Sequence, residues 1–174
     1  TYAGTSVGTM ICVLLCIGMK PIEIFYEICK IEKFLDISLE SYDYQNIFHI
    51  NKKFGLISKN NICEKISEIL IDKYGKIPTL KELYNITEKN IIFSVCNISK
   101  SRIEYMNYEN TPNISCIDAI RISCNLPIIF EKIEYNGDYY GDGGILDNFP
   151  IEIVDKGTNK ILAIVVSGNH INQD

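Results

Sequence analysis

The chain has 174 residues and a formal net charge of -5; 47% of its residues are hydrophobic and 22% are charged. This balance is typical of a folded globular domain, and the acidic charge without a long basic run argues against nucleic-acid binding. Seven scattered cysteines without a C-x-x-C pair predict neither a zinc site nor a disulfide framework, so we expect reduced thiols in a cytoplasmic protein. Those expected in the core are Cys12, Cys16, Cys96, Cys116 and Cys124.

No stretch of the sequence is long enough to span a bilayer. The apolar run from Met10 to Met19 is about half the roughly 20 residues that a spanning helix needs, and no basic region of signal-peptide type precedes it. The chain opens at Thr1, within what reads as the end of a strand. We therefore expect a single domain over residues 1–174 that lacks its N-terminal portion.

The first half of the chain predicts mainly helices. Residues 7–19 are apolar nearly all round, which predicts a helix buried on all sides, and Pro21 opens a second helix. Residues 36–60 show no clear period, and His49 within them is expected to be a loop residue. Apolar side chains recur at helical spacing within residues 60–75, and the stretch ends at a glycine, so it predicts an amphipathic helix.

The second half of the chain mixes strands with helices. A capping box of Thr79 and Glu82 predicts a short helix through residue 84, and residues 115–123 predict another. Residues 90–98 read as a strand rich in β-branched side chains, and residues 102–108 alternate like a half-exposed partner strand. The apolar run over residues 160–166 predicts a parallel strand buried on both faces. Together these elements predict an α/β fold with a mainly parallel sheet.

A G-x-S-x-G motif, Gly4-Thr5-Ser6-Val7-Gly8, lies between an expected central strand and the first helix. Such a motif arises by chance in roughly 5% of chains of this length, but a strand before it and a helix after it are what a nucleophile elbow requires. Glycines permit a strained turn, and a helix N-terminus favours developing negative charge. The motif equally suits a tight turn with Ser6 as a helix N-cap.

A second motif, Asp142-Gly143-Gly144, begins the stretch "DGGILDNFP". Glycine on both sides of the carboxylate, at 141 and 143, removes side-chain bulk, so a substrate or another loop can approach. A carboxylate beside a serine hydroxyl can act as its base. The same residues also suit an ordinary Asp-Gly turn between strands.

Taken together, Gly4-Thr5-Ser6-Val7-Gly8, "DAIRISCNLPIIFEKI" and "YGDGGILDNFPIEIVDKGTNKILAIVV" resemble the patatin-like phospholipases. The likeness runs from Thr1 to about Ser167 and is weakest over residues 36–60. It implies a three-layer α/β sandwich. It also implies a lipid acyl hydrolase with a Ser–Asp dyad, in which Ser6 is similar to the nucleophile and Asp142 to the base.

The resemblance also implies how the reaction is supported. Gly4, Val7 and Gly8 belong to the elbow, with the Val7 N–H as an oxyanion donor, and Gly143 and Gly144 belong to the loop beside the base. The family's upstream glycine-rich oxyanion loop is expected to be missing before Thr1. Neither a metal nor a cofactor is implied. The implied partner is membrane or micellar lipid, met transiently by a cytoplasmic protein, and the oligomeric state is not indicated.

Two other interpretations stay open. The order Ser6, Asp142, His170 also fits a Ser-Asp-His esterase. A lipid-binding or regulatory remnant that keeps the fold without activity is the third interpretation, because a fold alone does not establish chemistry.

Overall fold

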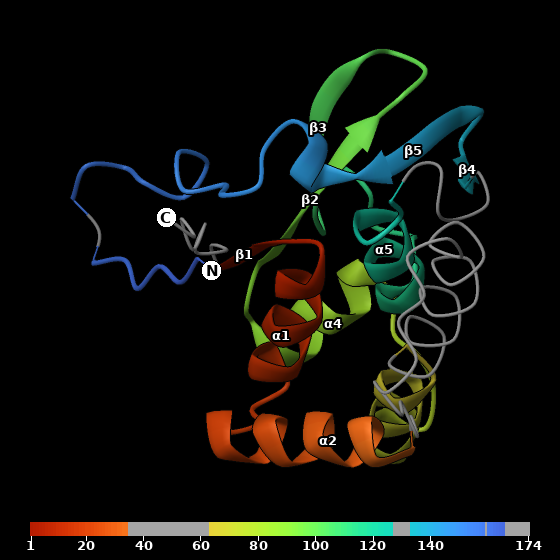
Figure 1. Cartoon of the computed structure of the whole chain (residues 1–174), viewed down its shortest axis with the longest axis vertical. Helices are drawn as coiled ribbons and strands as arrows, with labels where there is room; N and C mark the ends of the chain where they lie inside the picture. Colours follow the sequence, from red (N-terminus) through yellow and green to blue (C-terminus); the bar gives the residue numbers. More distant parts are fainter. Residues whose placement is uncertain (35–62, 127–132, 159, 166–174) are drawn as a thin grey trace, which may run out of the picture.

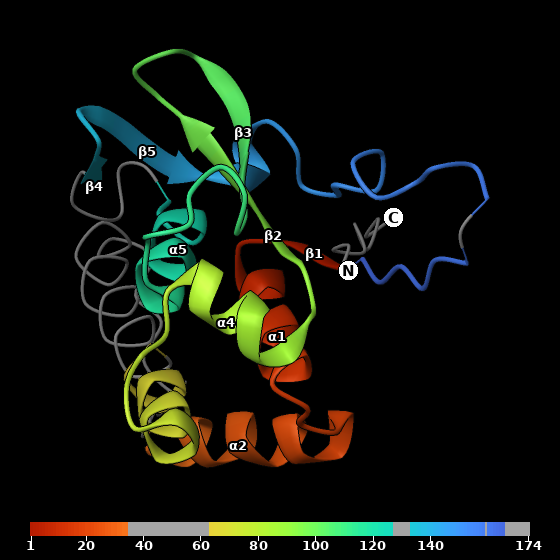
Figure 2. The same cartoon turned by 180° about the vertical axis from the view of Figure 1, so that it is seen from behind.

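The computed structural model describes residues 1–34, 63–126, 133–158 and 160–165. Figure 1 shows the course of the chain, and Figure 2 shows the same fold from behind. The strands are β1 (Tyr2–Thr5), β2 (Ile91–Asn97), β3 (Arg102–Met106), β4 (Ile133–Tyr135) and β5 (Asp138–Asp142). The helices are α1 (Val7–Cys16), α2 (Pro21–Phe34), α4 (Leu80–Thr87), α5 (Cys116–Ser123) and the short 3-10 helix η2 (Gly143–Ile145), with a further helix over residues 63–74.

The strands form one mixed sheet in the order β1-β2-β5-β4, and β3 also pairs with β2. This confirms the α/β class but corrects the expectation of a mainly parallel sheet. Among the described strands, β1 and β2 are parallel, whereas β2–β3, β2–β5 and β4–β5 are antiparallel. The reason is the connections: β2–β3 and β4–β5 are joined by short turns, and a short turn can join only antiparallel strands. The strand before Ser6, β1, is also at an edge of this described sheet and not at its centre.

The segment over residues 160–165 is not the buried parallel strand that its apolar sequence predicts. No strand is assigned there, and the Leu162 and Ile164 side chains are 89% and 80% exposed. Figure 1 shows this blue part of the chain lying apart from the helices that surround the core. An apolar run can become a buried strand only if a neighbouring edge pairs with it, and no described strand does so.

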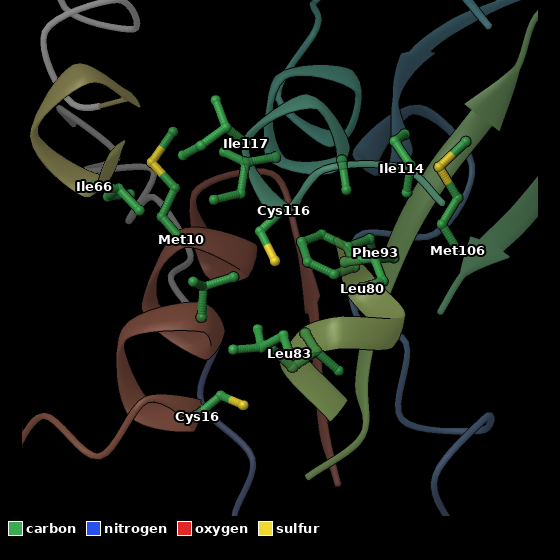
Figure 3. Close-up of a cluster of buried hydrophobic side chains, with 14 of the residues drawn as sticks. Met10, Cys16, Ile66, Leu80, Leu83, Phe93, Met106, Ile114, Cys116 and Ile117 are labelled. Atoms are coloured by element: carbon green, nitrogen blue, oxygen red, sulfur yellow. The ribbon is translucent and has the colours of Figure 1, made fainter. Parts of the chain in front are cut away.

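The core lies between the helices and one face of β2. Figure 3 shows Met10 of α1, Leu83 of α4 and Cys116 of α5 around Phe93 of β2. All seven residues of β2 are buried, so both faces of this strand are covered. The central strand of the described sheet is therefore β2, and not β1, the strand before Ser6 that was expected there.

Helix α1 has an exposed side, which corrects the expectation of burial all round. Thr9, Met10, Val13, Leu14 and Cys16 are buried, whereas Val7 and Ile11 are 58% and 38% exposed. The described sheet and helices pack against one face of α1 and leave the face with Val7 and Ile11 uncovered. The helix also ends at Cys16, earlier than predicted, where Gly18 takes a positive φ of 93°.

The predicted capping box is present, and a second cap, which was not predicted, begins α5. Thr79 and Glu82 form the capping box at the start of α4, which continues three residues beyond the predicted end to Thr87. Ser115 caps α5 by accepting a hydrogen bond from the Asp118 N–H. These caps fix α4 and α5 locally, so both helices begin where the sequence predicts.

The cysteines of the described core are reduced and mostly buried. Cys16, Cys96, Cys116 and Cys124 are buried and Cys12 is partly buried, which confirms the expected positions. Burial raises the pKa of the Cys12 thiol to about 11, with a further contribution from Cys16. A thiol with so high a pKa is a poor nucleophile at neutral pH.

Within the described residues, no helix combines the length and the apolar composition that crossing a membrane requires.

Candidate active site

Ser6 occupies a strained turn between β1 and α1. Its φ of 53° and ψ of -129° lie where a residue with a side chain is rarely found, at a cost of order 1–3 kcal/mol. Three hydrogen bonds hold this conformation. The Ser6 N–H donates to Ser123 Oγ at 3.2 Å, and the Ser6 carbonyl accepts from the Thr9 N–H at 2.9 Å and from Thr9 Oγ1 at 2.7 Å.

The two glycines that flank Ser6 have different roles. A Cβ on Gly4 would lie 2.7 Å from the Gly8 carbonyl carbon and 2.8 Å from the Thr9 nitrogen, so only glycine lets the strand pass this close to the helix. A Cβ on Gly8 would meet no atom of the described chain within 4 Å. Steric need therefore explains Gly4 but not Gly8.

Asp142 ends β5 and points its carboxylate at Ser6. Ser6 Oγ donates to Asp142 Oδ2 at 2.6 Å, and the Gly144 N–H donates to Oδ1 at 2.7 Å. The side chain is 2% exposed. The separation of the two side chains agrees with the distance that a serine and its base require. The pairing joins residues 136 positions apart in the sequence.

Both glycines after Asp142 lie in crowded places. A Cβ on Gly143 would lie 2.3 Å from the Ser94 carbonyl oxygen of β2, and one on Gly144 would lie 2.9 Å from Asn148 Oδ1 and 3.0 Å from Asp142 Oδ1. The predicted close approach therefore exists, and the backbone that approaches Gly143 belongs to β2.

Ser123, at the end of α5, connects the serine turn to the sheet. Its hydroxyl accepts from the Ser6 N–H and donates to the Ser94 carbonyl at 2.7 Å, and its side chain is fully buried. Asn125 also supports this region, because its carbonyl accepts from the Asp142 N–H at 2.7 Å.

The N-terminus of α1 lies directly after Ser6. The N–H groups of Val7 and Gly8 belong to the first turn of a ten-residue helix, where no carbonyl precedes them in the helix to accept their hydrogen bonds. Such groups and the helix dipole stabilise negative charge.

No group of three or more His, Cys, Asp or Glu side chains within the described part of the chain has the arrangement of a metal site.

The structure brings together the predicted residues Gly4, Ser6, Asp142, Gly143 and Gly144. They are held by groups that the sequence does not mark, namely those of Thr5, Thr9, Ser94, Ser123 and Asp147. These groups are four single hydroxyls and the backbone carbonyl of Asp147, and no sequence spacing identifies them. The two histidines, His49 and His170, lie outside the described residues.

Comparisons with known proteins find relatives of this chain. The family model described as "Patatin-like phospholipase" matches residues 1–155. "Probable lipid hydrolase 463L" of Invertebrate iridescent virus 6 is 36% identical over 164 residues, covering 92% of this chain and 54% of the relative. Protein R571 of Acanthamoeba polyphaga mimivirus is 30% identical over 176 residues, covering 100% of this chain and 57% of the relative.

A solved structure shares the fold. VipD from Legionella pneumophila matches with a TM-score of 0.52 and 20% identity, over 85% of this chain and 40% of that protein. The chain thus spans a little over half the length of the two viral relatives. The family match over most of the chain and its two motifs lead to one conclusion: this chain belongs to the patatin-like phospholipase family.

Proposed function

We propose that this chain carries the catalytic dyad of a lipid acyl hydrolase, with Ser6 as nucleophile and Asp142 as general base. The observation that carries the proposal is the 2.6 Å hydrogen bond from Ser6 Oγ to Asp142 Oδ2, made at a strained turn in front of a helix N-terminus. Membership of the patatin-like phospholipase family and a viral relative named as a lipid hydrolase support the choice of an acyl ester as substrate.

In the first step Ser6 Oγ attacks the ester carbonyl carbon while its proton passes to Asp142 Oδ2. The carbonyl oxygen becomes an oxyanion, which the N–H groups of Val7 and Gly8 are placed to stabilise. When the tetrahedral intermediate collapses, the bond to the leaving alcohol breaks and Asp142 returns the proton to that oxygen. An acyl-Ser6 and a free alcohol or lysolipid result.

In the second step water replaces the alcohol. Asp142 takes a proton from the water as its oxygen attacks the acyl carbon, and a second oxyanion forms. Collapse breaks the bond to Ser6 Oγ, which regains its proton from Asp142, and the fatty acid leaves. Neither step needs a group beyond the dyad, water and the oxyanion donors.

The immediate surroundings of Asp142 suit the role of a base. The Gly144 N–H holds Oδ1 at 2.7 Å, which leaves Oδ2 directed at the serine. The buried carboxylate therefore needs little rearrangement before proton transfer, and such preorganisation is a main source of enzymatic rate enhancement.

We further propose that the substrate is presented by a membrane or micelle, which a cytoplasmic protein contacts transiently. The residues that flank the dyad in sequence support an apolar substrate, because Val7, Ile145 and Leu146 are 58%, 50% and 53% exposed. Such side chains can contact acyl chains without first losing protein contacts.

The test is hydrolysis of p-nitrophenyl butyrate and of phosphatidylcholine in mixed micelles by the full-length protein. Ser6→Ala is expected to lower kcat by about 10³-fold or more. Ser67→Ala is the matched control. Ser67 lies in the helix over residues 63–74, and its hydroxyl bonds only the Cys63 carbonyl there. Full activity in Ser6→Ala, or no activity in a correctly folded wild type, contradicts the proposal; the latter result favours the non-catalytic interpretation.

A further inference from the structure

Asp147 connects the loop after Asp142 to the start of the serine turn. The Asp147 carbonyl accepts a hydrogen bond from Thr5 Oγ1 at 3.0 Å and another from Ser94 Oγ at 3.1 Å. Thr5 immediately precedes Ser6 on β1, and Ser94 lies on β2. One carbonyl therefore joins the loop to both parallel strands.

The carboxylate of Asp147 makes a third connection. Tyr105 of β3 donates its hydroxyl to Asp147 Oδ2 at 2.7 Å, and the Phe149 N–H donates to Oδ1 at 3.1 Å. Burial, followed by the hydrogen bond to Asp147, raises the pKa of Tyr105 to about 12. Tyr105 therefore stays protonated, and able to donate, throughout the pH range of an ordinary assay.

These contacts close the short loop that begins with the proposed base. The Asp147 N–H donates to the Gly143 carbonyl at 2.8 Å, so Asp147 fixes the position of the two glycines. Gly144 in turn holds Asp142 Oδ1 at 2.7 Å. A displacement of Asp147 would therefore move Gly143 and Gly144, and with them the Asp142 carboxylate that faces Ser6.

We infer that Asp147 and Tyr105 are positioning residues that hold the Asp142 carboxylate in line with the Ser6 hydroxyl. The inference rests on the proposed function, because the position of the Asp142 carboxylate affects the reaction only if Asp142 is the base for Ser6. Neither residue touches the reacting atoms. Their effect is on the geometry of proton transfer, where a misplacement of about 1 Å costs on the order of 10²-fold in rate.

The chain offers a matched control for Tyr105. Tyr140 donates its hydroxyl to Glu104 Oε2 at 2.9 Å, and burial, followed by this bond, raises its pKa to about 12 as well. Tyr105→Phe and Tyr140→Phe thus each remove a phenol hydroxyl that donates to a carboxylate, and both tyrosines belong to the same sheet. The first bond holds the loop after Asp142, whereas the second joins Tyr140 of β5 to Glu104 of β3 and does not touch that loop.

The experiment measures the full-length protein by two readouts. One is kcat and KM for p-nitrophenyl butyrate, and the other is the rate at which a fluorophosphonate probe modifies Ser6, located by peptide mass spectrometry. Tyr105→Phe and Asp147→Asn should each lower kcat and the modification rate by about 10-fold, within the range for a small misplacement, with KM nearly unchanged. Tyr140→Phe should keep both rates near wild type.

The double variant should be no slower than the slower single variant, because the two residues act as one unit. A second pair keeps the test valid if Tyr105→Phe folds poorly: Thr5→Val removes the hydroxyl that bonds the Asp147 carbonyl, and Thr5→Ser keeps it. Thr5→Val should be slow and Thr5→Ser should approach wild type.

The outcomes separate the two proposals. If the wild-type protein turns over the ester and its Ser6 reacts, but Tyr105→Phe is as fast as Tyr140→Phe, the positioning role is wrong. Equal slowing of both tyrosine variants also overturns it, because the effect then comes from the sheet in general. If Ser6 of the wild type does not react with the probe, the proposed function itself fails.

Discussion

The loop over residues 142–147 and the segment over residues 160–165 differ in how closely they are attached to the fold, and the difference is the reverse of what their compositions suggest. The first is rich in glycine and carboxylates, yet Asp142 is 2% exposed and the loop is bonded to β1, β2 and β3. The second is almost wholly apolar, yet Leu162 is 89% exposed. Burial here depends on specific contacts. Burying a polar segment costs little free energy when its groups are hydrogen-bonded, whereas an apolar segment is buried only where another surface covers it.

The largest expected effect comes from the tightest contact of the loop over residues 142–147. Gly143→Ala would place a Cβ 2.3 Å from the Ser94 carbonyl oxygen, and neither backbone can move without breaking the loop. We expect a loss of unfolding free energy of about 3 kcal/mol or more, comparable to severe overpacking of a core. Urea unfolding measures it. A loss below about 1 kcal/mol would show that the loop is not fixed against β2.

The next effect separates the two glycines of the serine turn. Gly4→Ala should destabilise the fold by about 1–3 kcal/mol, because its Cβ meets the Gly8 and Thr9 backbone. Gly8→Ala should instead be neutral or stabilise by up to about 1 kcal/mol, since Gly8 lies in α1 with open space around it. Thermal and urea unfolding compare the pair. Equal losses in both variants would contradict the assigned roles.

A smaller effect tests how the loop over residues 142–147 is anchored at alkaline pH. The pKa of Tyr105 rises from 10.0 to about 12 on folding, chiefly through burial and then through Asp147. The folded state holds this proton more tightly than the unfolded state does. The resulting stability is complete below about pH 10 and is lost as the pH rises toward 12. The urea midpoint of Tyr105→Phe should therefore fall less steeply over that range than that of wild type; equal slopes would contradict the anchor.

The smallest effect is expected in the exposed segment. Leu162→Ser in the 174-residue chain should change the free energy of unfolding by less than about 0.5 kcal/mol, as for other exposed positions. Urea unfolding again measures it. A loss of about 2 kcal/mol, typical of a core leucine, would show that residues 160–165 are packed and would remove the contrast between the two regions.

The local elements of the fold were largely predictable from the sequence. The capping box at Thr79 and the β-branched run of β2 each mark one element by a short-range pattern. The β4–β5 hairpin was missed although its signal is present. Asn136 and Gly137 form an Asn-Gly turn with φ of 52° and 82°, the standard sign of a two-residue hairpin.

The arrangement of the elements was less predictable. The apolar run of residues 160–165 looks like a buried strand, but its sequence does not say which edge would pair with it. The exposed face of α1 at Val7 and Ile11 has the same cause, because hydrophobicity does not indicate what covers a surface. Ser6 and Asp142 were found because two glycine-bounded motifs frame them. The hydroxyls of Thr5, Ser94 and Ser123 carry no such frame, and only the fold gives them a role.

The central claim is that Asp142, and no histidine, is the base for Ser6. The most direct measurement is kcat/KM for p-nitrophenyl butyrate in full-length Asp142→Asn, Ser6→Ala, the double variant and His170→Ala. If Asp142 is the base, Asp142→Asn should lose activity about as fully as Ser6→Ala, and the double variant should be no worse than either. His170→Ala should stay close to wild type. Near wild-type activity in Asp142→Asn, or loss of activity in His170→Ala equal to that in Ser6→Ala, would contradict it.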